Sequence, residues 1–224
     1  MQSPMRRLGR ALAVYAGTAA FLSAMAGAVV FEVFAARDVP ECGLVESLQA
    51  SVLLLASAAW FSEAAKGGRG IAGGDRALAL VGFATFAMFV RELDRFFDVA
   101  LQHGAWAAID AAVLAAAAVV MAKNRRKTLD DVAAFATTPR ALMTFLAVFS
   151  AVAFSQLLGW KGIWRSVFDN ELWESVKGRI LVYDQDVARH VKNVVEESVE
   201  LFSYSMLLVV AVVPRLLAGG KGKD

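Results

Sequence analysis

The sequence predicts an all-α, polytopic membrane protein: six transmembrane helices in a bundle, with an amphipathic helix at the outer interface between the fifth and sixth spans. Of the 224 residues, 58% are hydrophobic and 20% are charged. The apolar residues gather in blocks long enough to cross most of a hydrocarbon core of about 30 Å. These blocks show no alternation at period two, so we expect helices and not strands. The pattern excludes a soluble globular protein and a disordered chain.

The apolar blocks leave no room for a second domain, so we expect residues 1–224 to form a single membrane domain. We place the spans at residues 8–36, 44–65, 77–101, 105–122, 141–160 and 188–217. The first block has a basic start and carries Ala26-Gly27-Ala28, which could imitate a signal-peptide cleavage site. Its apolar run continues to Ala36, so a retained first helix is expected. Glycine and serine recur within the spans, and small residues let helices pack closely in lipid.

The loop between the fifth and sixth spans, residues 161–187, is longer than the others. Its apolar residues recur at helical spacing, with charged and polar residues in most of the gaps: Trp160, Ile163, Trp164, Val167 and Phe168. This spacing predicts an amphipathic helix or helix pair that lies on the outer interface and caps the bundle.

Lysine and arginine give the orientation. With the N-terminus inside, basic residues that flank the spans are about twice as frequent on the inner side as on the outer side. Because basic residues favour the cytoplasmic side, both termini are expected in the cytoplasm. The chain is therefore predicted to be a multi-pass protein of a bacterial-type inner (plasma) membrane.

Polar residues are concentrated at one depth of the predicted bundle. Counted from the inner basic flank of each span at about 1.5 Å per residue, each helix supplies a polar or ionisable group to one layer in the outer third. The layer contains Glu32, Glu46, Gln49, Arg91, Asp110, Gln156, Glu197 and Glu200. Ionisable groups at such depth are costly in lipid and usually face the bundle interior.

Two clusters dominate this layer. In the third span, Arg91, Asp94, Arg95 and Asp98 are expected on one helix face beside Glu92, where their charges could neutralise one another. In the sixth span, three carboxylates lie within five residues: Glu196, Glu197 and Glu200. The evident countercharge on their own helix is Lys192. These glutamates are predicted to be the main ligands of a binding site, with Arg91, Glu92, Asp94 and Glu46 around them.

The same residues suggest a metal site. Carboxylate oxygens suit magnesium, calcium or manganese, and one histidine would admit zinc or iron. Glu196, Glu200 and His190 are the expected ligands of such a divalent cation, the one cofactor that the sequence suggests.

Three functions remain open. The first is binding or transport of a cation or polar small molecule at an acidic cavity that opens outward, because the inner stretches at residues 77–90 and 206–213 carry no ionisable group. The second is a membrane-embedded, metal-dependent enzyme that acts on a lipid-linked or periplasmic substrate. The third is a structural subunit whose acids pair with arginines or with a partner chain.

The expected partners follow from the same composition. The lipid bilayer is the main partner. The formal net charge is +2, and no basic stretch is interleaved with aromatic residues on a soluble surface, so nucleic acid is excluded. The single cysteine, Cys42, excludes an internal disulfide. A membrane-protein partner or a second copy of the chain stays open.

Overall fold

The computed structural model describes residues 4–36, 43–67, 74–167 and 187–218, and in these ranges the chain is all α. Five segments are long and apolar enough to cross a membrane, as expected of a polytopic membrane protein. They are α1 (Pro4–Ala36), α2 (Leu44–Ala65), α5 (Ala105–Lys123), α7 to α8 (Pro139–Leu158) and α11 (Val187–Ala218). The connection from α5 to α7 is helical too, through α6 (Arg125–Ala136).

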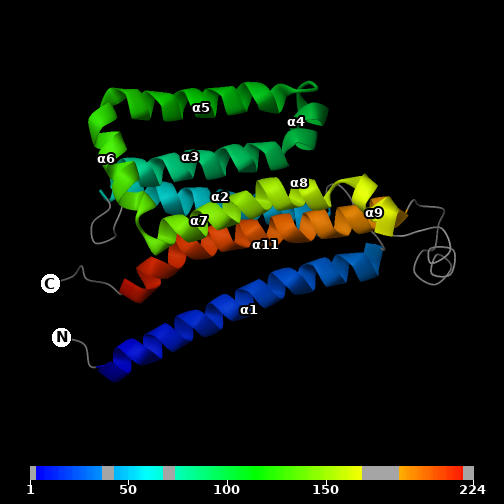
Figure 1. The fold of residues 1–224 in the computed structure, drawn as a ribbon, viewed down its shortest axis with the longest axis horizontal. Coiled ribbons are helices and arrows are strands. Elements are labelled where there is room, and N and C mark those ends of the chain that lie inside the picture. The colour runs from blue at the N-terminus through cyan, green and yellow to red at the C-terminus, as the bar shows by residue number, and fades with distance from the viewer. Residues whose placement is uncertain (1–3, 37–42, 68–73, 168–186, 219–224) are drawn as a thin grey trace.

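The third predicted span is not one continuous helix. Helix α3 (Asp75–Glu92) ends at Leu93, and the short α4 (Asp94–Ala100) turns toward α5 (Figure 1). The backbone N–H of Leu93 bonds to the carbonyl of Val90, three residues back, which tightens the last turn. The apolar run of α3 also ends here, so lipid no longer favours continuation of the helix. The prediction of one helix over residues 77–101 was therefore wrong.

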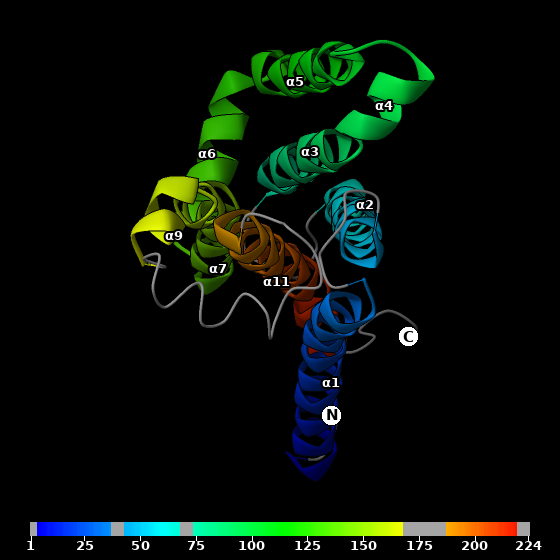
Figure 2. The ribbon, with the colours of Figure 1, turned by 90° about the vertical axis from the view of Figure 1, so that its right-hand side faces the viewer.

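Helix α11 lies at the centre of the bundle. It packs against α1, α2, α7 and α8, while α3 packs on α2 and reaches α11 through its end at Glu92, and α5 packs on α3 (Figures 1 and 2). A core cluster joins α2, α7 and α11 through Leu53, Ala147, Tyr204 and Leu207. Gly82 allows α2 and α3 to approach closely. A Cβ at this position would lie only 2.9 Å from the Phe61 ring. This contact agrees with the expected use of small residues in helix packing.

The lateral surface of the bundle, which would face lipid, is apolar. Large exposed hydrophobic residues occur on α1, α5 and α7, including Tyr15, Phe31, Leu114, Leu142 and Phe145. In α5 only Val113 is buried. Lipid tails are as apolar as these side chains, so a membrane accommodates a surface that water would not.

One end of the bundle is closed by a buried ion pair between α2 and α7. Both guanidinium ends of Arg140 donate to the two carboxylate oxygens of Glu63, each at 2.7 Å. The Arg140 guanidinium also lies 4.1 Å from the ring centre of Trp60. Arg215 approaches the same carboxylate, with Nε 3.3 Å from Glu63 Oε2.

Pro214 explains why an arginine is needed at this depth. Proline has no N–H, so within α11 the carbonyl of Val210, four residues earlier, loses its helical donor. Arg140 Nε donates to that carbonyl at 3.1 Å, and Nη2 donates to the carbonyl of Ala211 at 3.3 Å. Arg140 therefore supplies the donor that the Val210 carbonyl lacks and also neutralises the Glu63 carboxylate.

The predicted interfacial helix is described only at its start. Helix α9 (Lys161–Val167) follows α8, and Trp164 Nε1 donates to the carbonyl of Leu158 at 2.5 Å. Residues 168–186, which make up most of the predicted segment, lie outside the described residues.

Candidate functional site

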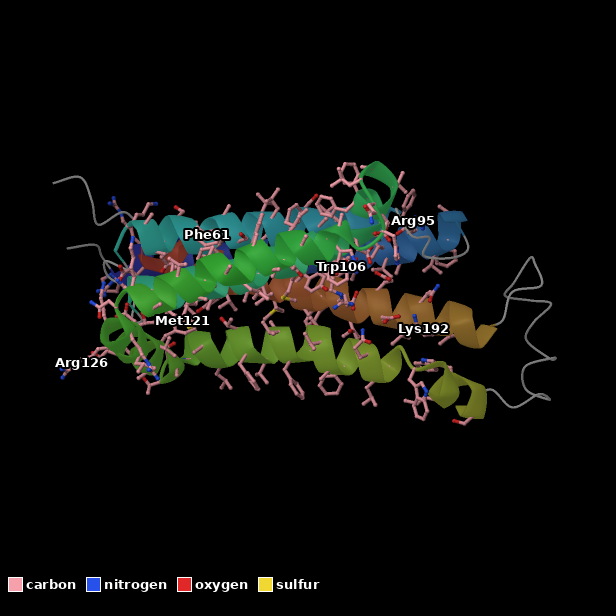
Figure 3. All side chains as sticks on the ribbon, turned by 90° about the horizontal axis from the view of Figure 1, so that it is seen from above. Phe61, Arg95, Trp106, Met121, Arg126 and Lys192 are labelled. Carbon is pink, nitrogen blue, oxygen red and sulfur yellow. The ribbon has the colours of Figure 1, made fainter. Side chains whose placement is uncertain are left out.

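The candidate site is a cluster of polar side chains that α2, α3, α8 and α11 bring together inside the bundle, named here the polar cluster. It contains Gln49, Arg91, Glu92, Ser155, Glu197, Glu200 and Tyr204. Figure 3 shows the two ends of the molecule, with Arg126 at one end and Arg95 and Lys192 in the other half. The cluster lies toward the end that contains Lys192, since its α11 members follow Lys192 by about 1.4 to 3.3 helical turns.

Tyr204 and Glu92 connect α11 to α3. The Tyr204 side chain is 1% exposed, and its hydroxyl donates to Glu92 Oε1 at 2.8 Å. A buried tyrosine hydroxyl normally finds a partner, and a carboxylate is a strong one. The bond holds the Glu92 side chain toward the centre of the bundle.

Gln49 and Glu197 connect α2 to α11. Gln49 is fully buried, and its Nε2 donates to the Glu197 carboxylate at 2.9 Å and to the Glu197 backbone carbonyl at 3.1 Å. Gln49 Oε1 has no hydrogen-bond partner among the described residues. Such an unpaired buried acceptor costs about 1–3 kcal/mol unless a donor or a cation reaches it.

Glu200 lies between Glu197 and Tyr204 on α11 and is 5% exposed. It is close enough to interact electrostatically with Glu92, Glu197 and Arg91, and its carboxyl lies near the Ser155 side chain. The Ser155 hydroxyl also bonds the carbonyl of Ala151 at 2.5 Å. Glu200 therefore faces a second carboxyl on each side and one guanidinium.

A π-helical turn places Ser155 against α11. The segment η1 (Ser150–Phe154) interrupts the helix between α7 and α8, and the N–H of Ser155 bonds to the carbonyl of Ser150, five residues earlier. The wider turn rotates the following residues relative to an unbroken α-helix. Single π turns of this kind are frequent at functional sites.

Arg91 extends the polar cluster toward α5. It is close enough to interact electrostatically with Tyr204, Glu200, Glu92 and Asp94, and Asp110 of α5 is within its range too. Asp110 Oδ1 is buried and has no hydrogen-bond partner among the described residues. Glu46 also lies near the cluster, within electrostatic range of Glu92 and Glu197.

Other predicted site residues have different neighbours. Glu196 pairs with Lys192 at 2.5 Å, and its carboxylate lies against Gly159 at the end of α8. The break at Leu93 separates Asp94 from Glu92, and Asp98 binds the backbone N–H of Gly104 and the His103 ring. The four-residue charge ladder expected on one helix face is thus divided between α3 and α4, and that expectation was wrong.

Glu32, which the depth count placed in the polar layer, caps a neighbouring helix. Its two carboxylate oxygens accept the backbone N–H groups of Leu44 and Val45, at 2.5 and 2.7 Å. These amides begin α2, where the first N–H groups have no partner within the helix. A carboxylate there also complements the helix dipole.

Removing this cap gives a direct test. Glu32→Ala is expected to lower the free energy of unfolding by about 1–2 kcal/mol, because two N–H groups at the start of α2 lose their acceptor. Thermal unfolding in detergent measures the loss, and hydrogen exchange at Leu44 and Val45 should become faster. Glu32→Gln keeps one good acceptor, so its free energy of unfolding should lie between those of the wild type and Glu32→Ala. Unchanged exchange at both amides would show that another group caps α2.

The described residues contain no group of three or more His, Cys, Asp or Glu side chains arranged to hold a metal ion. The side chain of His190, one of the three expected metal ligands, lies outside the described residues. The metal site therefore stays a prediction.

Comparison of the chain with protein-family models, curated proteins and solved structures finds no match.

Proposed function

We propose that the chain is an inner-membrane protein with six membrane helices and both termini in the cytoplasm, which binds a cation or a cationic small molecule at the polar cluster from the outer side. The observation that carries the proposal is the charge balance of the cluster. Glu92, Glu197 and Glu200 lie within electrostatic range of one another, and Arg91 lies within range of Glu92 and Glu200.

Helix α3 is the one proposed span that is not among the five long apolar segments, and it is the third span in chain order. Its 18 residues correspond to about 27 Å at the helical rise, close to the thickness of a hydrocarbon core. It lies alongside α2 and α5 (Figure 1). Its charged residues are at the two ends, with Asp75 and Arg76 at one end and Arg91 and Glu92 at the other.

Three carboxylates and one guanidinium leave an excess of negative charge, and an uncompensated buried charge costs several kcal/mol. A proton on one of these carboxyls, or a cation held by one or two of them together with neutral oxygens, would reduce this cost. The Ser155 hydroxyl donates its proton to the Ala151 carbonyl, so its oxygen lone pairs would be a neutral ligand for such a guest. Gln49 Oε1 would be a further neutral ligand.

Access from the outer side is supported by the packing of the other half. A second core cluster fills it, with Trp60, Leu78, Phe135 and Ala211 among its members. The buried pair of Glu63 and Arg140 adjoins this cluster through Trp60. A cation that entered from that end would have to pass an apolar core and a guanidinium.

The test is cation-dependent stability. Purified protein in detergent is heated in sodium, potassium, magnesium, calcium or tetramethylammonium chloride, with the bulky N-methylglucamine salt at equal ionic strength as reference. A cation at about 100 times its Kd adds about 2.7 kcal/mol to the free energy of unfolding and raises Tm. Glu200→Gln, which is isosteric, should abolish the rise.

Glu196→Gln is the matched control. It lies on the same helix, and its charge is already paired with Lys192, so the cation response should survive. If no cation raises Tm in the wild type, or if Glu200→Gln responds like the wild type, the proposed site is wrong.

A structural role is the second candidate, favoured by the two hydrogen bonds that join helices through the cluster, from Tyr204 to Glu92 and from Gln49 to Glu197. In that case Glu200→Gln would change Tm by the same amount in every salt. The metal-dependent enzyme stays a prediction of the sequence.

A further inference from the structure

A second, apolar site lies between α1 and α11, in the half of the bundle away from the polar cluster. It is a groove of about 500 Å³. Helix α1 contributes Ala13, Gly17 and Phe21 to it, and α11 contributes Leu208 and Val212. The groove forms because α1 contacts α11 mainly through Met25 and Val29, in the other half, and separates from it toward the N-terminus (Figure 1).

The groove has the length of one leaflet. Its α1 residues recur every three or four positions from Arg10 to Phe21, so they form a single helix face. The eleven helical rises from Arg10 to Phe21 cover about 16 Å, which is close to half of a hydrocarbon core of about 30 Å. A Cβ on Gly17 would meet no atom within 4 Å, so the middle of the groove is open.

Charge is present at one end only. Arg10 is half-buried and lines the groove at its N-terminal end. Arg10 makes no hydrogen bond or ion pair with the part of the chain that the structure describes. The other lining residues are apolar apart from Thr18, whose hydroxyl is used by the Val14 carbonyl. The site thus combines one cation at its end with an apolar channel.

We infer that this groove binds one acyl chain of an anionic phospholipid, with the headgroup phosphate on Arg10. The phosphate lies at the membrane surface, where anionic lipids attract basic residues. A guanidinium is well suited to it, because it can donate two parallel hydrogen bonds. The lipid would fill the space that α1 leaves open and hold α1 to α11.

A second copy of the chain fits the groove less well. A two-fold contact through this face would bring the N-terminal turns of two α1 helices together, each with Arg6, Arg7 and Arg10. Like charges at close range repel in a low dielectric. An anionic lipid instead supplies the charge opposite to Arg10.

The inference is tested by native mass spectrometry of the full chain released from nanodiscs of phosphatidylglycerol or phosphatidylcholine with the same acyl chains. We expect one phosphatidylglycerol to be retained per chain, at least tenfold more than phosphatidylcholine. Arg10→Gln should remove the preference for phosphatidylglycerol. Gly17→Leu should remove retention of both lipids, because its side chain enters the groove.

Ala16→Leu is the matched control, since Ala16 precedes Gly17 on α1 but does not line the groove; it should retain lipid as the wild type does. Should Gly17→Leu not fold, Ala13→Leu fills the same groove. Equal retention of the two lipids, or retention that survives Gly17→Leu, would overturn the inference. A dimer that Gly17→Leu dissociates without loss of lipid would overturn it too, in favour of a second copy.

Discussion

Arg140→Met is expected to lower the free energy of unfolding by about 3–5 kcal/mol, which is the usual cost of breaking a buried ion pair. The side chain of Arg140 is 7% exposed and that of Glu63 5%. Methionine leaves the Glu63 carboxylate with Arg215 alone and leaves the Val210 carbonyl, which Pro214 deprives of its helical donor, without any partner. Thermal unfolding in detergent at constant lipid content measures the change.

Two further variants separate this explanation from a general loss of packing. Arg126→Met removes an exposed arginine of α6 and should change the free energy of unfolding by less than about 0.5 kcal/mol. Glu63→Leu combined with Arg140→Met removes both charges, so it should cost less than the sum of the single variants. Additive losses would show that the pair is not what stabilises this end.

The same residues show how far a sequence can predict this fold. Length and apolarity predict the five segments that could cross a membrane, because lipid requires a continuous apolar run of nearly fixed length. They do not predict the break at Leu93, which depends on local turn formation where charged residues begin. Nor do they predict the pair of Arg140 and Glu63, since it joins positions 77 residues apart. Pro214 is the sequence signal for a polar side chain at this position, because a proline inside a membrane helix leaves one backbone carbonyl that needs a donor from elsewhere.

For the candidate site, the depth of each residue along its span was easier to predict than the side of the helix that its side chain faces. Counting along each span places Glu197, Glu200 and Arg91 at similar depth, and the structure brings Glu92, the neighbour of Arg91, near both glutamates. The count cannot tell which of two adjacent residues faces the interior. Glu196 and Glu197 differ by about 100° around the helix, and only contacts with α8 and α2 separate them. The cap that Glu32 gives to α2 likewise depends on a neighbouring helix.

Tyr204→Phe has the next largest expected effect, a loss of about 1.5–3 kcal/mol in the free energy of unfolding, the usual worth of a hydrogen bond to a charged group. Phenylalanine preserves the packing of this buried ring but leaves Glu92 without its donor. Tyr15→Phe is the matched control, since Tyr15 is 58% exposed on α1 and should tolerate the change. Thermal unfolding of all variants is measured with and without the stabilising cation.

Combining Tyr204→Phe with Glu92→Gln then shows whether the hydrogen bond between Tyr204 and Glu92 serves stability alone or cation binding as well. If Tyr204 acts by holding a charged Glu92, Glu92→Gln should remove most of the difference between tyrosine and phenylalanine at position 204. In the proposed site, Tyr204→Phe also weakens cation binding, because Glu92 no longer stays directed toward Glu197 and Glu200. A stability loss with unchanged cation affinity would assign the bond to helix packing alone. A phenylalanine variant as stable as the wild type would mean that Glu92 finds another donor, and that this connection between α3 and α11 is not needed.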